Sequence, residues 1–99
     1  MTTLEQLQQW YQSHCNEDWE QQYGITIETI DNPGWSIEID LTETELEGKS
    51  FDAIDIAEPA TDWMKCWVED EKFIGMGAPS KLNDLLQAFV RWAHENKAG

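Results

Sequence analysis

The residues best suited to chemistry in this sequence are His14, Cys15 and Cys66. A cysteine nucleophile needs a thiolate, a neighbouring base and a site that stabilises an oxyanion. His14 and Cys15 are adjacent near the end of a predicted helix, so their side chains point about 100° apart, and Cys66 falls on the inward face of a predicted strand. We predict that both cysteines are core residues. A small enzyme with a cysteine nucleophile, such as a sulfur-transfer enzyme, is the alternative.

Metal and cofactor sites are not predicted. The 20 Asp and Glu residues could supply ligands, but the sequence has no Cys-x-x-Cys, no pair of histidines four residues apart and no calcium-binding loop. Gly75-x-Gly77 is followed by Pro79 in an acidic context, which disfavours a phosphate loop. Nothing selects two carboxylates as a glycosidase pair. We therefore expect no catalytic residues, no metal and no cofactor.

Charge is the strongest compositional signal, with 20 acidic and six basic residues and a formal net charge of −14. Residues 1–71 hold 18 of the acidic residues and only two of the basic ones. Such a field repels nucleic acids and anionic membranes and accelerates association with cationic proteins. We predict a basic protein partner. Two alternatives are that the charge only keeps the protein soluble, or that the chain is an acidic scaffold or adaptor.

The chain is expected to form one domain over residues 1–99. Its length and its 40% of apolar residues suit a single core, with no room for a second one. No apolar run approaches the ~18 residues of a membrane span, and the first residues lack the pattern of a signal peptide. We expect a cytoplasmic protein with reduced cysteines.

Helices are predicted at both ends of the chain. Thr2 or Thr3, followed three residues later by Glu5 or Gln6, forms a capping-box pattern. Beyond it an apolar stripe is expected to face the core: Leu4, Leu7 and Tyr11, with Trp10 beside them. A short helical turn capped by Asn16 should follow. The last helix is predicted to begin at Ser80 as N-cap and to carry a broad apolar face: Leu82, Leu85, Leu86, Phe89, Val90 and Ala93.

Five strands are predicted between the helices. Residues 25–29 and 35–41 alternate with a period of two, as half-buried strands do. The turn Asn32-Pro33-Gly34-Trp35 favours type II geometry, because Pro33 fixes φ near −65° and Gly34 accepts a positive φ. Residues 42–50 are predicted as a loop, 51–56 as a third strand, and 63–68 and 73–76 as a second hairpin.

These elements predict an α+β fold. It has an N-terminal helix, about five short and mainly antiparallel strands in hairpins, and a C-terminal helix packed on one sheet face. The other face is free for solvent or a partner. We expect Trp35 to pack beneath its turn, and Trp10 and Trp92 to be core residues. Trp63 and Trp67 share the strand face opposite Met64, Cys66 and Val68, which makes them candidate interface anchors.

Acidic side chains near the first hairpin complete the candidate partner-binding surface. Glu38 and Asp40 occupy the outward face of the strand that the turn fixes. Three more acids lie in the loop that follows this strand: Glu43, Glu45 and Glu47. Together with Trp63 and Trp67, these five acids are the candidate contacts for a basic partner.

Several segments resemble the immunity protein 53 family of bacterial polymorphic toxin systems. They are CNEDWEQQYGITIETIDNPGWSIEIDL at residues 15–41, WMKCW at 63–67 and GAPSKLNDLLQAFVRW at 77–92. The most specific residues are Trp19 and Glu20, and the run Asp31, Asn32, Pro33, Gly34 and Trp35. The sequence departs from the family at Ala78, where an acidic residue is more usual.

The resemblance implies an α+β protein without enzymatic activity that binds and blocks a cognate toxin domain. A nuclease toxin is basic where it holds phosphate, and a strongly acidic surface could occupy that site as a nucleic-acid mimic. Among the family residues, we expect Glu20 to cap or pair internally, with direct toxin contact as the alternative. Pro33 and Gly34 are expected to shape the surface.

Overall fold

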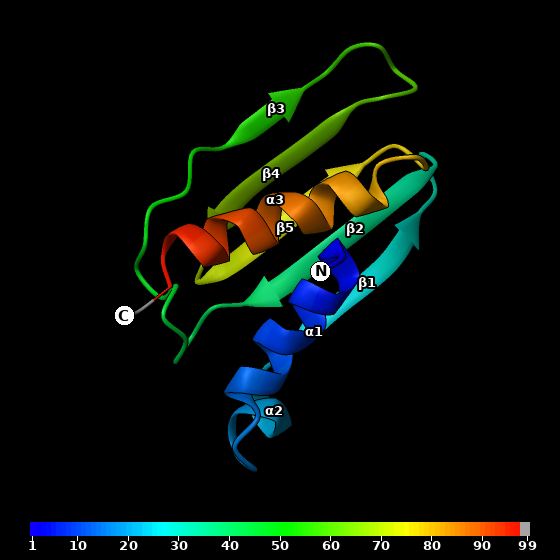
Figure 1. The fold of residues 1–99 in the computed structure, drawn as a ribbon. Coiled ribbons are helices and arrows are strands. Elements are labelled where there is room, and N and C mark those ends of the chain that lie inside the picture. The colour runs from blue at the N-terminus through cyan, green and yellow to red at the C-terminus, as the bar shows by residue number, and fades with distance from the viewer. Residues whose placement is uncertain (98–99) are drawn as a thin grey trace.

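The computed structural model describes residues 1–97, and its fold is α+β (Figure 1). Along the chain the elements are α1 (Thr3–His14), α2 (Trp19–Gln22), β1 (Ile25–Ile30), β2 (Gly34–Asp40), β3 (Ile54–Ile56), β4 (Met64–Glu69), β5 (Lys72–Gly77) and α3 (Leu82–Glu95). The strands form one sheet in the order β1-β2-β5-β4-β3, and all neighbours are antiparallel. Both predicted hairpins are confirmed.

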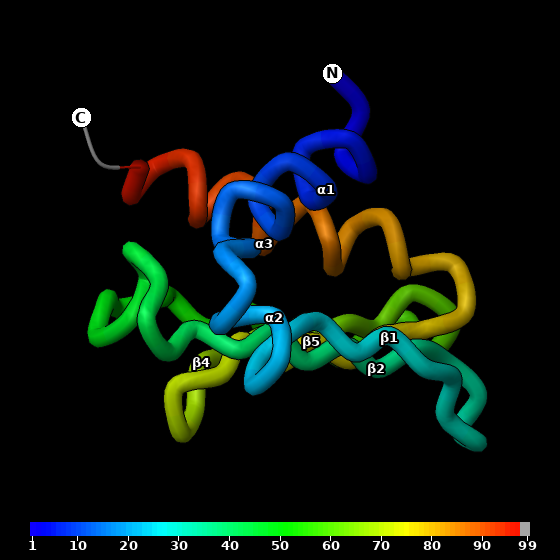
Figure 2. The backbone as a smooth tube through the Cα atoms, turned by 90° about the horizontal axis from the view of Figure 1, so that it is seen from below, coloured from blue at the N-terminus to red at the C-terminus, as the bar shows by residue number. Residues whose placement is uncertain are grey.

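The longer helices, α1 and α3, lie on the same face of the sheet, and the other face is uncovered (Figure 2). The core lies between the helices and the sheet. Its largest fully buried side chains are Phe73, Phe89, Ile37, Ile39, Leu41, Leu46, Leu85 and Cys66. Edge-to-face packing of Phe73 with Phe51 and with Phe89 links the sheet, the long loop and α3. The prediction of one covered and one uncovered sheet face is confirmed.

Helix α3 approaches β5 closely because two strand residues carry no side chain. A Cβ atom on Gly75 would lie 3.0 Å from the Ile37 side chain and 3.3 Å from that of Leu85. A Cβ atom on Gly77 would lie 3.0 Å from Cβ of Lys81. Ordinary strand side chains at these two positions would therefore lift the start of α3 away from the sheet.

The capping box of α1 is confirmed, and Thr2 is its N-cap. The Thr2 hydroxyl accepts the Glu5 N–H at 3.1 Å, and the Thr2 N–H donates to the Glu5 carboxylate at 3.0 Å. The hydrogen bond from the Thr2 backbone N–H is the main cause of a lowered pKa at Glu5. Leu7 and Trp10 face the core as predicted, but Leu4 and Tyr11 are exposed, at 57% and 36%. The predicted stripe is therefore too wide, because α1 turns only its Leu7 and Trp10 side fully inward.

The type II turn predicted at Asn32-Pro33-Gly34-Trp35 is wrong. The Asn32-Pro33 peptide bond is cis, and Gly34 has no positive φ because it is already the first residue of β2. Residues 31–33 form the loop, and Ile30 pairs with Gly34. Glycine is required here for another reason: a Cβ atom on Gly34 would overlap the carbonyl oxygen of Gly77.

Two further boundaries differ from prediction. The N-cap of α3 is Lys81 rather than Ser80, and it has no side-chain hydrogen bond to the helix; the Ser80 hydroxyl points to the Asp62 carboxylate instead, at 3.5 Å. The third strand covers only Ile54–Ile56.

The β4–β5 hairpin closes through Asp70 and Glu71, both with positive φ, at 52° and 59°. Positive φ at both central residues is the signature of a type I′ turn.

We expect Gly34→Ala to lower the free energy of unfolding by about 2 kcal/mol, because the new methyl group must push β2 away from Gly77. Gly24→Ala is the matched control, since a Cβ atom there meets no heavy atom within 4 Å; its effect should stay within about 0.5 kcal/mol. Urea denaturation followed by tryptophan fluorescence measures both. Equal stability of the two variants would contradict the close-approach explanation.

Candidate protein-binding face

The uncovered side of the sheet is the candidate site, and we call it the open face. The strand registers align one set of alternating residues on this side, because successive strand side chains point to opposite faces. Its members are Thr26, Glu28, Ser36, Glu38, Asp40, Asp55, Lys65, Trp67, Glu69, Lys72, Ile74 and Met76. The opposite set lies on the helix side of the sheet, where Ile37, Ile39, Phe73 and Cys66 are buried under the helices.

The open face has an apolar centre and a charged rim. Ile74 pairs with Glu38 on one side and with Trp67 on the other, and Met76 lies next along β5. All three apolar side chains are only partly buried. The charged members are Glu28, Glu38, Asp40, Asp55 and Glu69, against Lys65 and Lys72. This pattern suits a protein interface, in which apolar anchors sit inside a polar rim.

The ion pair on this face is weak. The Lys72 ammonium lies 3.9 Å from the Glu38 carboxylate, and both side chains are almost half exposed. Such surface pairs contribute little to stability, and solvent and salt screen them. Glu38 therefore keeps its charge available to a partner.

The two candidate tryptophan anchors differ in position. Trp67 lies in the middle of β4 on the open face, and its indole N–H donates to the Glu69 carboxylate at 3.0 Å. Trp63 precedes β4, is half-buried, and accepts the Ala78 N–H with its carbonyl oxygen at 3.0 Å. Trp67 is thus at the centre of the face, while Trp63 lies at one end of it.

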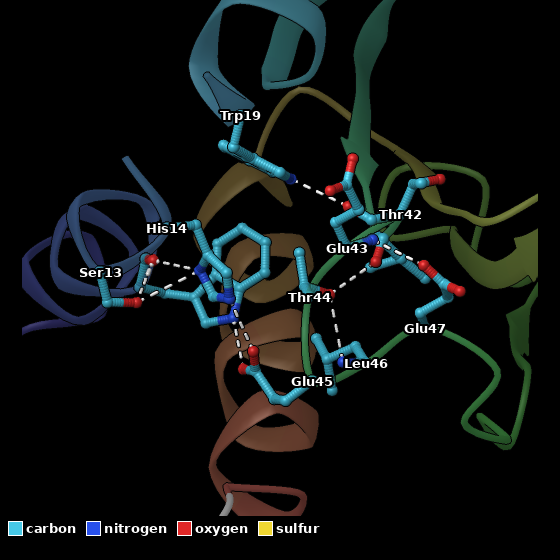
Figure 3. Close-up of polar contacts among 11 residues, drawn as sticks. Ser13, His14, Trp19, Thr42, Glu43, Thr44, Glu45, Leu46 and Glu47 are labelled. Carbon is cyan, nitrogen blue, oxygen red and sulfur yellow. Dashed lines mark hydrogen bonds and ion pairs between the residues drawn. The ribbon is translucent and has the colours of Figure 1, made fainter. Parts of the chain in front are cut away.

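Glu45, one of the loop acids, makes internal contacts on the helix side of the sheet. Its carboxylate accepts hydrogen bonds from the Trp10 indole at 2.8 Å and from Nε2 of His14 at 2.7 Å (Figure 3). Both residues belong to α1. Glu45 therefore ties the long loop between β2 and β3 to the first helix.

Glu43 and Glu47 stabilise the same loop (Figure 3). The Glu47 carboxylate accepts the Glu43 N–H at 2.6 Å, and the Thr44 hydroxyl donates to the Leu41 carbonyl and accepts the Leu46 N–H. Leu46 is then held in the core with no exposed surface.

Of the five candidate acids, the structure brings only Glu38 and Asp40 onto the open face. Asp40 also accepts the Gly24 N–H, at 2.9 Å.

The family residues Trp19 and Glu20 hold the corner between α1 and β1. Trp19 is 3% exposed, and its indole N–H donates to the Thr42 carbonyl at 2.9 Å (Figure 3). The Glu20 carboxylate accepts the N–H groups of Asn16 and Glu17 at 2.9 and 2.8 Å. Backbone hydrogen bonds, first that of its own N–H, lower the pKa of Glu20. This geometry matches the internal role expected for Glu20.

The family residues 31–35 lie partly at the tip of the first hairpin and partly in the sheet. Asp31, Asn32 and Pro33 are exposed at the tip, whereas Gly34 is buried. Trp35 packs against the core on the helix side, and its indole N–H donates to the Pro79 carbonyl at 2.9 Å. Trp35 therefore joins the hairpin to the segment that leads into α3.

The two cysteines differ in burial. Cys66 has no exposed surface, and burial raises the pKa of its thiol to about 12. Cys15 is exposed, and its thiol donates to the Tyr11 carbonyl at 3.4 Å. The core prediction is thus confirmed for Cys66 and wrong for Cys15, because α1 ends at His14 and Cys15 lies beyond it as the C-cap. Residues 1–97 contain no cluster of three or more potential metal-ligating side chains.

The sequence prediction left some members of the open face unassigned. Ile74, Met76, Glu28 and Glu69 were not among the candidate contacts, although the same period-two alternation assigns them to this face.

Within the described part of the chain, no helix is both long and apolar enough to cross a membrane.

Comparison with known proteins gives one match. The family model described as immunity protein 53 matches residues 4–94, a range that includes every helix and strand except the first residue of α1 and the last of α3. No curated protein and no solved structure matches the chain. The family supports an immunity role, suggests a toxin as the protein partner and implies that the protein is not an enzyme. This chain belongs to the immunity protein 53 family.

Proposed function

We propose that this protein binds a cognate toxin domain with a basic surface, such as a nuclease, and neutralises it through the open face. The observation that supports this proposal most directly is the composition of that face. Trp67, Ile74 and Met76 form a partly exposed apolar centre, and acidic residues outnumber lysines around it. A soluble sheet face without a partner needs no such centre.

Charge supports a basic partner. Residues 1–48 contain neither lysine nor arginine, and the net charge is −14. A nuclease must concentrate positive charge where it holds the phosphates of its substrate. A carboxylate-rich surface is attracted to that site over distance and competes there with the nucleic acid.

Within this proposal the acids have two roles. Glu38 and Asp40 contribute charge on the open face, whereas Glu43, Glu45 and Glu47 shape the loop beside it through hydrogen bonds. Trp67 is the proposed anchor, because a large aromatic ring in the centre of an interface typically controls dissociation. Trp63 would contact the partner at the edge of the same surface.

Co-expression with a toxin tests the function. The C-terminal domain of the nearest large secreted-protein gene is expressed with and without this protein, and cell survival and co-purification are scored. Survival with a stable complex is the expected result. Cell death despite good expression, or the absence of a complex, would contradict the proposal and favour an acidic scaffold or adaptor.

We expect Glu38→Lys combined with Glu69→Lys to slow association with the toxin domain about tenfold at low salt and to flatten its salt dependence. Both residues lie on the open face. The control is Glu58→Lys combined with Glu95→Lys, which changes the net charge equally at exposed positions outside that face. Stopped-flow fluorescence measures the rates. Equal slowing by both pairs would mean that only the net charge matters.

The thiols provide a test of the enzyme alternative. At pH 8 we expect iodoacetamide to modify Cys15 in the folded protein and to leave Cys66 unmodified, because Cys66 is buried and its pKa is raised to about 12. In denaturant both should react, as peptide mass spectrometry would show. Rapid modification of Cys66 in the folded protein near neutral pH would instead support a nucleophilic cysteine.

A further inference from the structure

Strand β1 forms one edge of the sheet, and only β2 pairs with it. It is six residues long, whereas β3 at the opposite edge has three. The outer side of β1 is not covered by either long helix (Figures 1 and 2). The β1 edge is therefore longer than the β3 edge and offers more backbone for pairing with another strand.

The hydrogen-bond pattern shows which backbone groups of β1 point outward. The Asp40 N–H donates to the Gly24 carbonyl at 3.0 Å, and the next residue, Leu41, donates to Glu71 on the β5 side at 2.9 Å. Antiparallel strands alternate their bonding direction residue by residue. Thr26, Glu28 and Ile30 therefore bond to β2. The N–H and C=O groups of the remaining three face away from the sheet: Ile25, Ile27 and Thr29.

Strand β1 has one charged residue, Glu28, but lacks the other devices that normally protect such an edge. It contains no lysine and no proline, and its register with β2 is continuous, without a bulge. Native proteins usually use one of these features to prevent pairing with another strand. In addition, Ile27 exposes 41% of its surface on the helix side of the sheet. The edge thus presents three outward N–H groups and an exposed apolar side chain.

We infer that an extended segment of the cognate toxin pairs with β1 and continues the sheet, an inference that rests on the proposed function. Main-chain hydrogen bonds to Ile25, Ile27 and Thr29 would supply affinity, and alternating side chains would supply specificity. The segment carries an apolar residue against Ile27 on the helix side. On the open face it carries a cationic residue against Glu28.

Charge favours this occupant over a second copy of the same chain. Each copy carries −14, so pairing two copies through β1 would bring two strongly negative surfaces together. The cross-strand neighbour of Thr26 is Glu38, which adds a second carboxylate close to the edge. A cationic segment is attracted to this edge, whereas a second copy is repelled from it.

Ile27→Lys tests the edge, and Ile56→Lys is its control. Ile56 is similarly exposed, at 46%, and lies on the helix side of the other edge strand. Both variants add one positive charge, so their difference reports position alone. We expect Ile27→Lys to weaken binding of the co-expressed toxin domain at least tenfold and Ile56→Lys to leave it unchanged, as measured by isothermal titration calorimetry. Thermal unfolding of both variants checks that the fold is intact.

Amide hydrogen exchange provides a readout that is specific to strand pairing. In the free protein, Thr26 and Glu28 should exchange slowly and Ile25, Ile27 and Thr29 rapidly. Toxin binding should slow the three rapid amides at least tenfold. A neutralising complex in which they stay rapid would overturn the edge inference and leave the proposed function intact.

Two other outcomes would overturn the inference differently. Failure of the wild-type protein to bind or neutralise the toxin domain would remove the proposed function and this inference with it. A concentration-dependent dimer of the free protein in sedimentation experiments, lost in Ile27→Lys, would assign the edge to a second copy.

Discussion

The structure depends on the close contact between α3 and β5. Gly75 and Gly77 leave space into which the start of α3 descends, so that Leu85 reaches the sheet. This contact selects which side of every strand is buried, because a sheet register couples the side-chain directions of all its strands. Once Phe73 and Ile37 face the helix, Ile74 and Glu38 must face the other way. The chemistry of the open face is therefore a consequence of packing on the opposite side.

Most of the fold could be predicted because its determinants are local. The period-two runs in residues 25–41 and 63–76 fix both hairpins, and Thr2 with Glu5 fixes the start of α1. The sequence correctly indicates that glycine is needed at position 34, but the predicted reason, a positive φ, is wrong. The role of Gly34 depends on Gly77, far away in the sequence, and no local pattern carries that information.

The candidate site was predictable to a similar extent. Alternation placed Glu38, Asp40 and Trp67 on the uncovered face. Glu45 was grouped with them because it is acidic and close in sequence, yet its partners are Trp10 and His14 in α1. A carboxylate that is hydrogen-bonded within the fold looks the same in a sequence as one that is exposed. Only tertiary contacts separate these two kinds of acid.

In the β4–β5 turn, an acidic residue occupies a position where its backbone conformation is strained. Asp70 and Glu71 both adopt positive φ. Aspartate tolerates this conformation, but Glu71 adopts it with more steric strain than glycine or asparagine would. The chain has carboxylates at both positions, next to Glu69 at the end of the open face. At Glu71 the sequence therefore keeps a negative charge where another residue would adopt the backbone conformation more easily. Attempts to engineer a more thermostable version by relaxing the turn would also weaken the electrostatic field of the protein.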